Sequence, residues 1–151
     1  MERLIEYFVP EKYVLNLSIN KNEKTIEGTV KVSGLVKNEI IKFHAVDLKV
    51  SNVAINGAKK KFKTNGQELI IFEAPMGETD IEISYSGCLN ENMEGAYLST
   101  YEYEGETEVI VATQFESHYA RQAFPCIDEP GAKAIFELTF TVPEGIGRAH
   151  V

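Results

Sequence analysis

Apolar and polar side chains alternate with a period of two along most of this chain, and this pattern restricts the fold more than any other feature. The alternation opens with four apolar residues, each separated from the next by one residue: Tyr13, Leu15, Leu17 and Ile19. It continues in the segments 26–32, 46–55, 81–85 and 134–142. Because successive side chains of a strand point to opposite faces, the pattern is typical of strands with one buried face.

Helical periodicity is weak by comparison. No segment of ten or more residues follows a 3.6-residue period, and the best candidate is one short turn at 117–123. Tight hairpin turns are expected at three dipeptides in which glycine supplies a positive φ: Asn56-Gly57, Asn65-Gly66 and Glu104-Gly105. The apolar phase slips by one residue at Ser51-Asn52, which predicts a bulge. The sequence therefore predicts an all-β fold, either an antiparallel multi-stranded sandwich or a saddle-like pair of curved sheets.

Length and charge narrow the possible functions. The chain has 151 residues, of which 44% are hydrophobic and 25% charged, so we assign residues 1–151 to one globular domain. The net charge of −8 argues against nucleic acid, because phosphate binding needs a clustered basic surface. It also argues against an anionic membrane surface. The one basic run, Lys59–Lys61, is expected at a strand edge, where lysines discourage edge pairing.

The cellular compartment is predicted from three absences in the sequence. No segment approaches the ~20 apolar residues of a membrane span. Glu2 and Arg3 place charges where a signal peptide needs an apolar stretch. Cys88 and Cys126 are too few for a disulfide framework and lack CxxC spacing, so we expect buried or half-buried free thiols. The chain is therefore expected to be cytoplasmic.

One long polar segment, residues 111–133, interrupts the alternation between two apolar strands. Its polar residues are Thr113, Gln114, Glu116, Ser117, His118, Arg121, Gln122, Asp128 and Glu129. Pro125 and Pro130 exclude a regular helix or an inner strand between them. A long polar excursion between buried strands is where a β-scaffold usually carries function.

The same segment carries the most specific motif of the chain. It reads Ala112-Thr113-Gln114-Phe115-Glu116 and then Ala120-Arg121-Gln122-Ala123-Phe124-Pro125-Cys126-Ile127-Asp128-Glu129-Pro130. This stretch resembles the signature of the amino-terminal β-domain of the M1 family of zinc aminopeptidases, in particular its bacterial aminopeptidase N type. Shorter likenesses at 10–13, 25–28, 47–48, 85–87 and 133–136 extend the resemblance over most of the chain.

The resemblance implies that the parent protein is a hydrolase, a zinc metallo-aminopeptidase that removes single amino-terminal residues from peptides. The zinc of this family lies in a following catalytic domain, on an HExxH helix with a further Glu downstream. This chain has no HExxH, and its three histidines, His44, His118 and His150, are scattered. We therefore expect no metal ligand, no bound cofactor and no catalytic residue here, and no peptidase activity from the chain alone.

Two residues of the motif are implied to reach the substrate. By position, Glu116 would accept a hydrogen bond from the α-ammonium of the peptide, and Gln114 would line the pocket for its first side chain. Such a charge-assisted hydrogen bond is worth about 1.5–3 kcal/mol. Two residues apart in an extended strand, both side chains lie on one face. The expected partners are the amino terminus of a peptide and the missing catalytic domain, with no nucleic acid and no membrane.

Other interpretations of the chain remain open. Ile146–Val151 fits the family pattern poorly, so the domain is expected to be truncated near its carboxy-terminal end. An alternative is a free-standing β-sandwich module that binds a peptide terminus or a carbohydrate without catalysis. Its carbohydrate platform would be Tyr97, Tyr101 and Tyr103, which cross-strand packing explains more simply. A truncated fragment without a function of its own is the third possibility.

Three further residues of the excursion have structural interpretations. Asp128 and Glu129 are expected to accept backbone amides of the turn between the two prolines, or to pair with Arg121, rather than to act as catalytic carboxylates. Cys126 is expected to be a packed structural cysteine. His118 and Glu116 alone would not make a metal site, because two ligands are too few.

Overall fold

The fold is all-β, as the alternation predicts. The computed structural model describes residues 3–20, 23–88, 95–103, 105–114, 124–127, 129 and 133–141, with the backbone alone described at 95–103, 106–114, 138, 140 and 141. These residues form one 3₁₀ turn and eleven strands: η1 (Leu4–Glu6), β1 (Phe8–Asn20), β2 (Thr25–Val36), β3 (Ile41–His44), β4 (Lys49–Ile55), β5 (Ala58–Lys59), β6 (Phe62–Thr64), β7 (Glu68–Ile71), β8 (Gly77–Cys88), β9 (Gly95–Tyr103), β10 (Glu106–Gln114) and β11 (Ile135–Thr141). None of the described residues forms a helix with the length and apolarity needed to cross a membrane.

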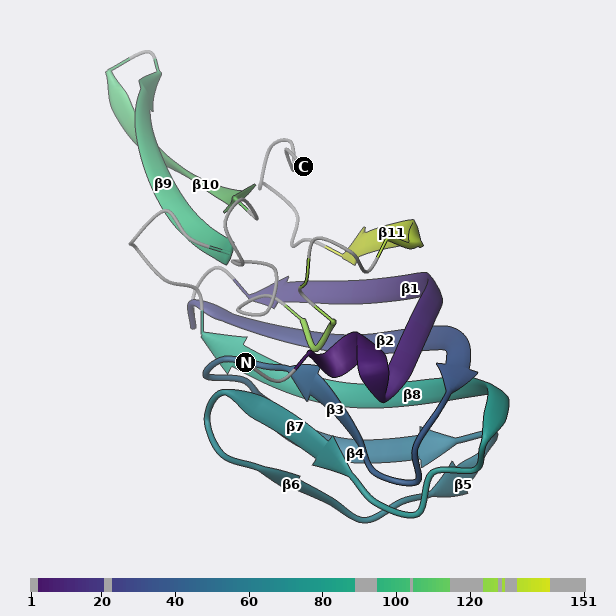
Figure 1. Ribbon diagram of the computed structural model, residues 1–151. Helices are drawn as coiled ribbons and strands as arrows, with labels where there is room; N and C mark the ends of the chain where they lie inside the picture. Colours follow the sequence, from purple (N-terminus) through teal and green to yellow (C-terminus); the bar gives the residue numbers. More distant parts are fainter. Residues whose placement is uncertain are drawn as a thin grey trace.

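Six strands form the large sheet, in the order β11-β1-β2-β8-β4-β5 (Figure 1). The antiparallel prediction holds for every pair in this sheet except one, because β11 runs parallel to β1, with Lys12 opposite Ile135. Parallel neighbours need a long crossover connection, and here the chain between β1 and β11 passes through all the other strands. The polar excursion is the last part of that connection, so it returns the chain to its first strand.

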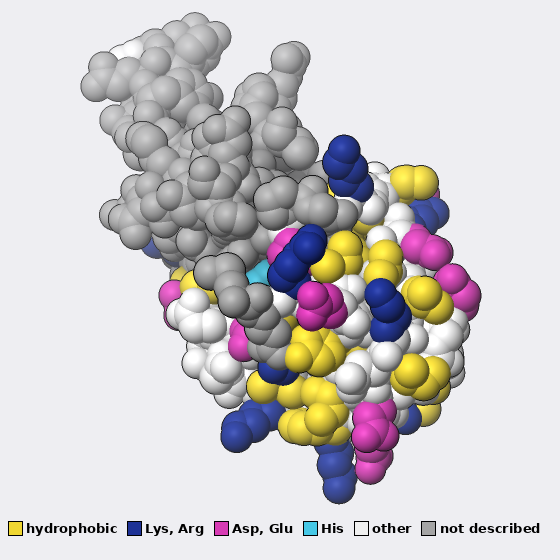
Figure 2. Space-filling model, viewed as in Figure 1, with side chains coloured by type: hydrophobic (Ala, Val, Ile, Leu, Met, Phe, Trp, Pro, Cys, Tyr) yellow, Lys and Arg dark blue, Asp and Glu magenta, His cyan; other side chains and the backbone are white. Residues whose placement is uncertain are grey.

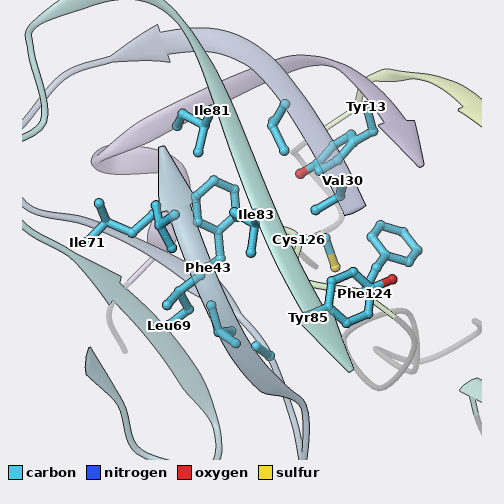
Figure 3. Close-up of a cluster of buried hydrophobic side chains, with 14 of the residues drawn as sticks. Tyr13, Val30, Phe43, Leu69, Ile71, Ile81, Ile83, Tyr85, Phe124 and Cys126 are labelled. Carbon is cyan, nitrogen blue, oxygen red and sulfur yellow. The ribbon is translucent and has the colours of Figure 1, made fainter. Parts of the chain in front are cut away.

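The small sheet, β3-β7-β6, packs across one face of the large sheet (Figure 1). The apolar positions predicted from the alternation meet in the space between them (Figure 3). Phe43 of β3 lies 5.5 Å from Phe8 of β1, measured between ring centroids. Leu69 and Ile71 of β7 and Ile81 and Ile83 of β8 are completely buried. Two sheets that share such a core form a sandwich, so the fold class is confirmed.

The predicted bulge and turns are found where the sequence suggested them. The register between β4 and β8 shifts between Val50 and Asn52. Asn56 and Gly57 both have positive φ, 51° and 86°, as a two-residue hairpin turn requires. Gly66 also has a positive φ of 86°, and the Asn65 side chain accepts two backbone N–H groups just after it. Glycine-containing turns therefore set the strand registers.

Two burial predictions are wrong. Cys88 is a free thiol as expected, but it is exposed at the end of β8. Phe136 was expected on a buried face and is 49% exposed, because β11 is an edge strand at the margin of the core. At the opposite edge of the large sheet, Lys59 of β5 is exposed, which confirms the predicted position of the basic run.

Candidate functional site

The candidate site begins at the end of β10, where the Thr-Gln-x-Glu motif starts. Strands β9 and β10 form a separate two-stranded hairpin that lies outside both larger sheets (Figure 1). Gly105, with a φ of 80°, makes the predicted turn at its tip. The last residue pair at the opposite, open end is Gln114 with Gly95. Gln114 therefore ends a paired strand, and Glu116 lies outside the described residues, as does the short turn expected at 117–123.

The second half of the motif is anchored in the core. Phe124, Cys126 and Ile127 are 2%, 3% and 4% exposed, which confirms that Cys126 is packed. Cys126 and His44 exchange backbone hydrogen bonds of 2.7 and 3.0 Å, so this segment pairs briefly with β3. The backbone N–H of Ile127 donates to the Tyr13 hydroxyl at 3.0 Å. Cys126 and Ile127 therefore fix the second half of the motif to the sandwich.

Glu129 ties the motif to the start of the chain. Its two carboxylate oxygens accept the backbone N–H groups of Leu4 and Ile5, at 2.7 and 3.1 Å. These amides belong to η1, whose first turn has no intrahelical acceptor for them. Glu129 does accept backbone amides, but the prediction of its partners is wrong, because these amides belong to η1 and not to the turn between the two prolines. Asp128, Pro130 and Arg121 lie outside the described residues.

A buried tyrosine lies beside this anchor. Tyr85 of β8 is 3% exposed and lies near Phe124 and Cys126 in the core (Figure 3). Its hydroxyl is buried without a hydrogen bond among the described residues. Burial and, secondarily, the neighbouring Cys126 raise the pKa of the Tyr85 phenol above its ordinary value. A Cβ on Gly28 would lie 2.6 Å from this hydroxyl, so the ring occupies space that only glycine leaves open.

A shallow polar hollow lies on the outer face of the large sheet, away from the motif. Its cavity volume is about 600 Å³. The strand registers place Asn16, Thr29 and Ser84 in one cross-strand row. Ser18, Glu27, Ser86 and Lys49 form the next row. Hydroxyl and amide groups with one carboxylate and one ammonium are typical of the hydrated face of an antiparallel sheet, so this hollow is not the candidate site.

Charge is dispersed over the described surface. Figure 2 shows lysine and arginine side chains interspersed with aspartate and glutamate on the face that carries η1 and the small sheet. Lys12 and Glu137 form an ion pair of 2.8 Å between β1 and β11, with both side chains largely exposed. A basic stripe of the kind that binds nucleic acid is not present on the part of this face that the structure describes.

The described residues do not provide a zinc site. Among them, no three His, Cys, Asp or Glu side chains gather closely enough to hold a metal ion. His44 is the one described histidine, and its backbone is occupied by the bridge to Cys126. The predicted absence of metal ligands at His118 and His150 falls outside the described residues.

The described architecture is a two-sheet β-domain with a separate hairpin that ends at Gln114 and with Phe124, Cys126 and Ile127 buried in its core. The description "Peptidase M1 N-terminal domain" matches residues 9–146 of this chain. The chain belongs to the Peptidase M1 N-terminal domain family, which confirms the resemblance found in the sequence.

Aminopeptidases from bacteria and plants share the domain. The chain is 42% identical over 149 residues to "Aminopeptidase N" of Lactococcus lactis subsp. lactis (strain IL1403), an alignment that covers 97% of this chain. It is 37% identical over 149 residues to "Aminopeptidase N" of Lactobacillus helveticus, again over 97% of the chain. It is 33% identical over 157 residues to "Aminopeptidase M1" of Arabidopsis thaliana, over 93% of the chain. In each case the alignment spans 18% of the relative.

Proposed function

We propose that this chain is the substrate-recognition domain of a zinc aminopeptidase that removes amino-terminal residues from peptides. The family match over residues 9–146 carries the proposal, together with the names of the relatives, all of which are aminopeptidases. In this proposal the domain supplies recognition, a following domain supplies the chemistry, and the enzyme works in the cytoplasm.

Glu116 is proposed to recognise the free α-ammonium of the substrate. An exopeptidase must locate its cleavage point by the distance from the chain terminus, and a fixed carboxylate measures that distance from the charged amine. A hydrogen bond between ammonium and carboxylate is worth about 1.5–3 kcal/mol. Gln114 is proposed to line the pocket for the first side chain, with its amide able to donate and to accept.

Zinc has no part in the steps assigned to this chain. The described residues lack a suitable ligand set for the metal. The zinc is therefore assigned to the following domain, and this chain binds and orients the substrate. When bound there, zinc would activate a water molecule for attack on the peptide carbonyl. Orientation by a second domain contributes to rate because a bound near-attack geometry removes much of the entropy barrier.

The test is substitution of Glu116 in the full-length aminopeptidase that contains this domain. Glu116→Ala should lower kcat/KM for amino-acid amides by at least about tenfold, the value of one charged hydrogen bond. Glu116→Gln keeps a hydrogen-bond acceptor but loses the charge, so its kcat/KM should lie between the values of the wild type and of Glu116→Ala. The matched control is Glu106→Ala, at the opposite end of β10, which should leave kcat/KM unchanged. Unchanged kinetics for Glu116→Ala would remove Glu116 from the site.

A further inference from the structure

The polar hollow on the outer face of the large sheet holds one negative and one positive side chain on either side of a serine. Glu27 of β2 and Lys49 of β4 are each directly opposite Ser86 of β8, the strand between them. Neighbouring strands are about 4.8 Å apart, so the Cα atoms of the two charged residues are separated by about 10 Å. Both side chains are exposed, and neither forms an ion pair with another residue that the structure describes. The hollow therefore presents two opposite, unpaired charges at a fixed spacing.

Small hydroxyl side chains line the space beside these charges. Thr29 and Ser84, both half-buried, are directly opposite each other in the next cross-strand row. Ser51 lies at the bulge of β4, and its hydroxyl donates to the backbone carbonyl of Ser84 at 3.1 Å. A bulge bends its strand locally, and small side chains fill little of the space above the sheet. The resulting cavity of about 600 Å³ is within the range of small-ligand sites.

We infer that this hollow binds a short zwitterionic peptide of about three residues, with Glu27 holding its α-ammonium and Lys49 its carboxylate. An extended chain spans at most roughly 3.3–3.6 Å per residue, so a tripeptide has nearly the same length as the spacing of the two charges. A ligand that carries both charges supplies a partner to each of these side chains. The hydroxyls of Thr29, Ser84 and Ser86 can donate to and accept from the peptide groups between its ends.

The first experiment titrates the purified 151-residue chain with trialanine and follows the backbone amide resonances by NMR. The largest shifts should be at Glu27, Ser84 and Ser86, with a dissociation constant in the millimolar range, because each exposed ion pair contributes little. N-acetylated trialanine lacks the ammonium and trialanine amide lacks the carboxylate, so each should bind at least about threefold more weakly. Dialanine is too short to reach both charges, and its affinity should fall by a similar factor.

The second experiment assigns each charge to one end of the peptide. Glu27→Gln should weaken trialanine binding at least about threefold and leave the affinity for the N-acetylated peptide unchanged. Lys49→Gln should weaken trialanine binding equally and leave the affinity for the amide unchanged. Glu82→Gln and Lys31→Gln are the matched controls, since both residues are exposed on the same face and lie opposite each other outside the hollow. Because salt screens charges at that distance, the controls should change the affinity by less than about twofold. Thermal unfolding of each variant checks that the fold is retained.

The outcomes separate a binding site from a hydrated sheet face and from the proposed substrate site. Equal affinity for the free and the blocked peptides, or an absence of shifts at the hollow, would overturn the inference. A loss of binding in Glu116→Ala that Glu27→Gln does not reproduce would also overturn it, because the peptide would then lie at the proposed substrate site. The inference uses neither Gln114 nor Glu116, so its failure leaves the proposed function unchanged.

Discussion

A single carboxylate, that of Glu129, fastens the polar excursion to the amino-terminal turn of the domain. It accepts two backbone N–H groups that η1 cannot satisfy itself. Glu129→Gln leaves one oxygen acceptor and removes the charge, so we expect a loss of about 1–3 kcal/mol in the free energy of unfolding. Urea denaturation would measure it, and amide hydrogen exchange at Leu4 and Ile5 should accelerate. Glu39→Gln, at an exposed position, is the control, and equal stability of both variants would contradict the assigned role.

Two buried tyrosines make a second comparison, because their hydroxyl groups differ in hydrogen bonding. The Tyr13 hydroxyl accepts the N–H of Ile127, whereas the Tyr85 hydroxyl has no hydrogen bond among the described residues. Tyr13→Phe should therefore destabilise the domain by about 1–3 kcal/mol, since a buried N–H loses its acceptor. Tyr85→Phe should be neutral or stabilising, because it removes an unpaired buried hydroxyl. A similar loss for both variants in urea denaturation would contradict this account.

The pH dependence of stability should separate the same variants. The raised pKa of Tyr85 means that the folded domain holds the phenolic proton more tightly than the unfolded chain does. Above pH ~10 the unfolded chain loses this proton first, so the free energy of unfolding falls as the pH rises. The Tyr85→Phe variant should lack this component, and its advantage over the wild type should increase above that pH.

At the scale of strands, β11 is held to β1 by more than backbone hydrogen bonds. Phe136 stacks on Tyr13 with ring centroids 4.9 Å apart and an interplanar angle of 4°. The Lys12–Glu137 ion pair lies close by but is exposed to solvent, so it should contribute little. Phe136→Ala should therefore cost about 1–2 kcal/mol, while Lys12→Met should cost less than about 0.5. The reverse order of the two losses in urea denaturation would show that the ion pair holds the strand.

The strands also show what the sequence can and cannot predict. Local signals were sufficient for the turn at Asn56-Gly57 and for the bulge at Ser51-Asn52, because each depends on neighbouring residues alone. The parallel pairing of β11 with β1 could not be predicted, since it joins residues more than a hundred positions apart. The contact of Glu129 with η1 could not be predicted for the same reason.

The hairpin that leads to the candidate site was predicted only in part by the sequence pattern. The sequence predicts the turn at Glu104-Gly105, and the strands on either side of it extend to Gly95 and Gln114. Glycine and alanine at the start of β9 weaken the apolar signal there. Symmetric counting from the turn at Glu104-Gly105 would have paired Gly95 with Gln114, so the missing information was already present in the turn.

At the scale of the whole molecule, the sandwich and the candidate site occupy different parts of the chain. The core lies between the two larger sheets, and the hairpin that carries Gln114 lies outside them (Figure 1). A two-stranded hairpin is marginally stable by itself in water, so the β9–β10 hairpin depends on the packing of its surroundings. The chain spans 18% of the length of the aminopeptidases that it resembles. In the proposed division of roles, this chain recognises the substrate and the rest of the enzyme carries out catalysis.

That division predicts a folded but inactive domain when the 151-residue chain is purified alone. Its core is formed by strands on both sides of the sandwich, so it should unfold cooperatively in urea. It should not hydrolyse a chromogenic amino-acid amide with or without added zinc, because the sequence has no HExxH and the described residues offer no ligand set. The full-length aminopeptidase, assayed alongside, is the positive control. Turnover that copurifies with the isolated chain and disappears with a chelator would mean that the chain holds its own metal, and the assignment of all chemistry to another domain would be wrong.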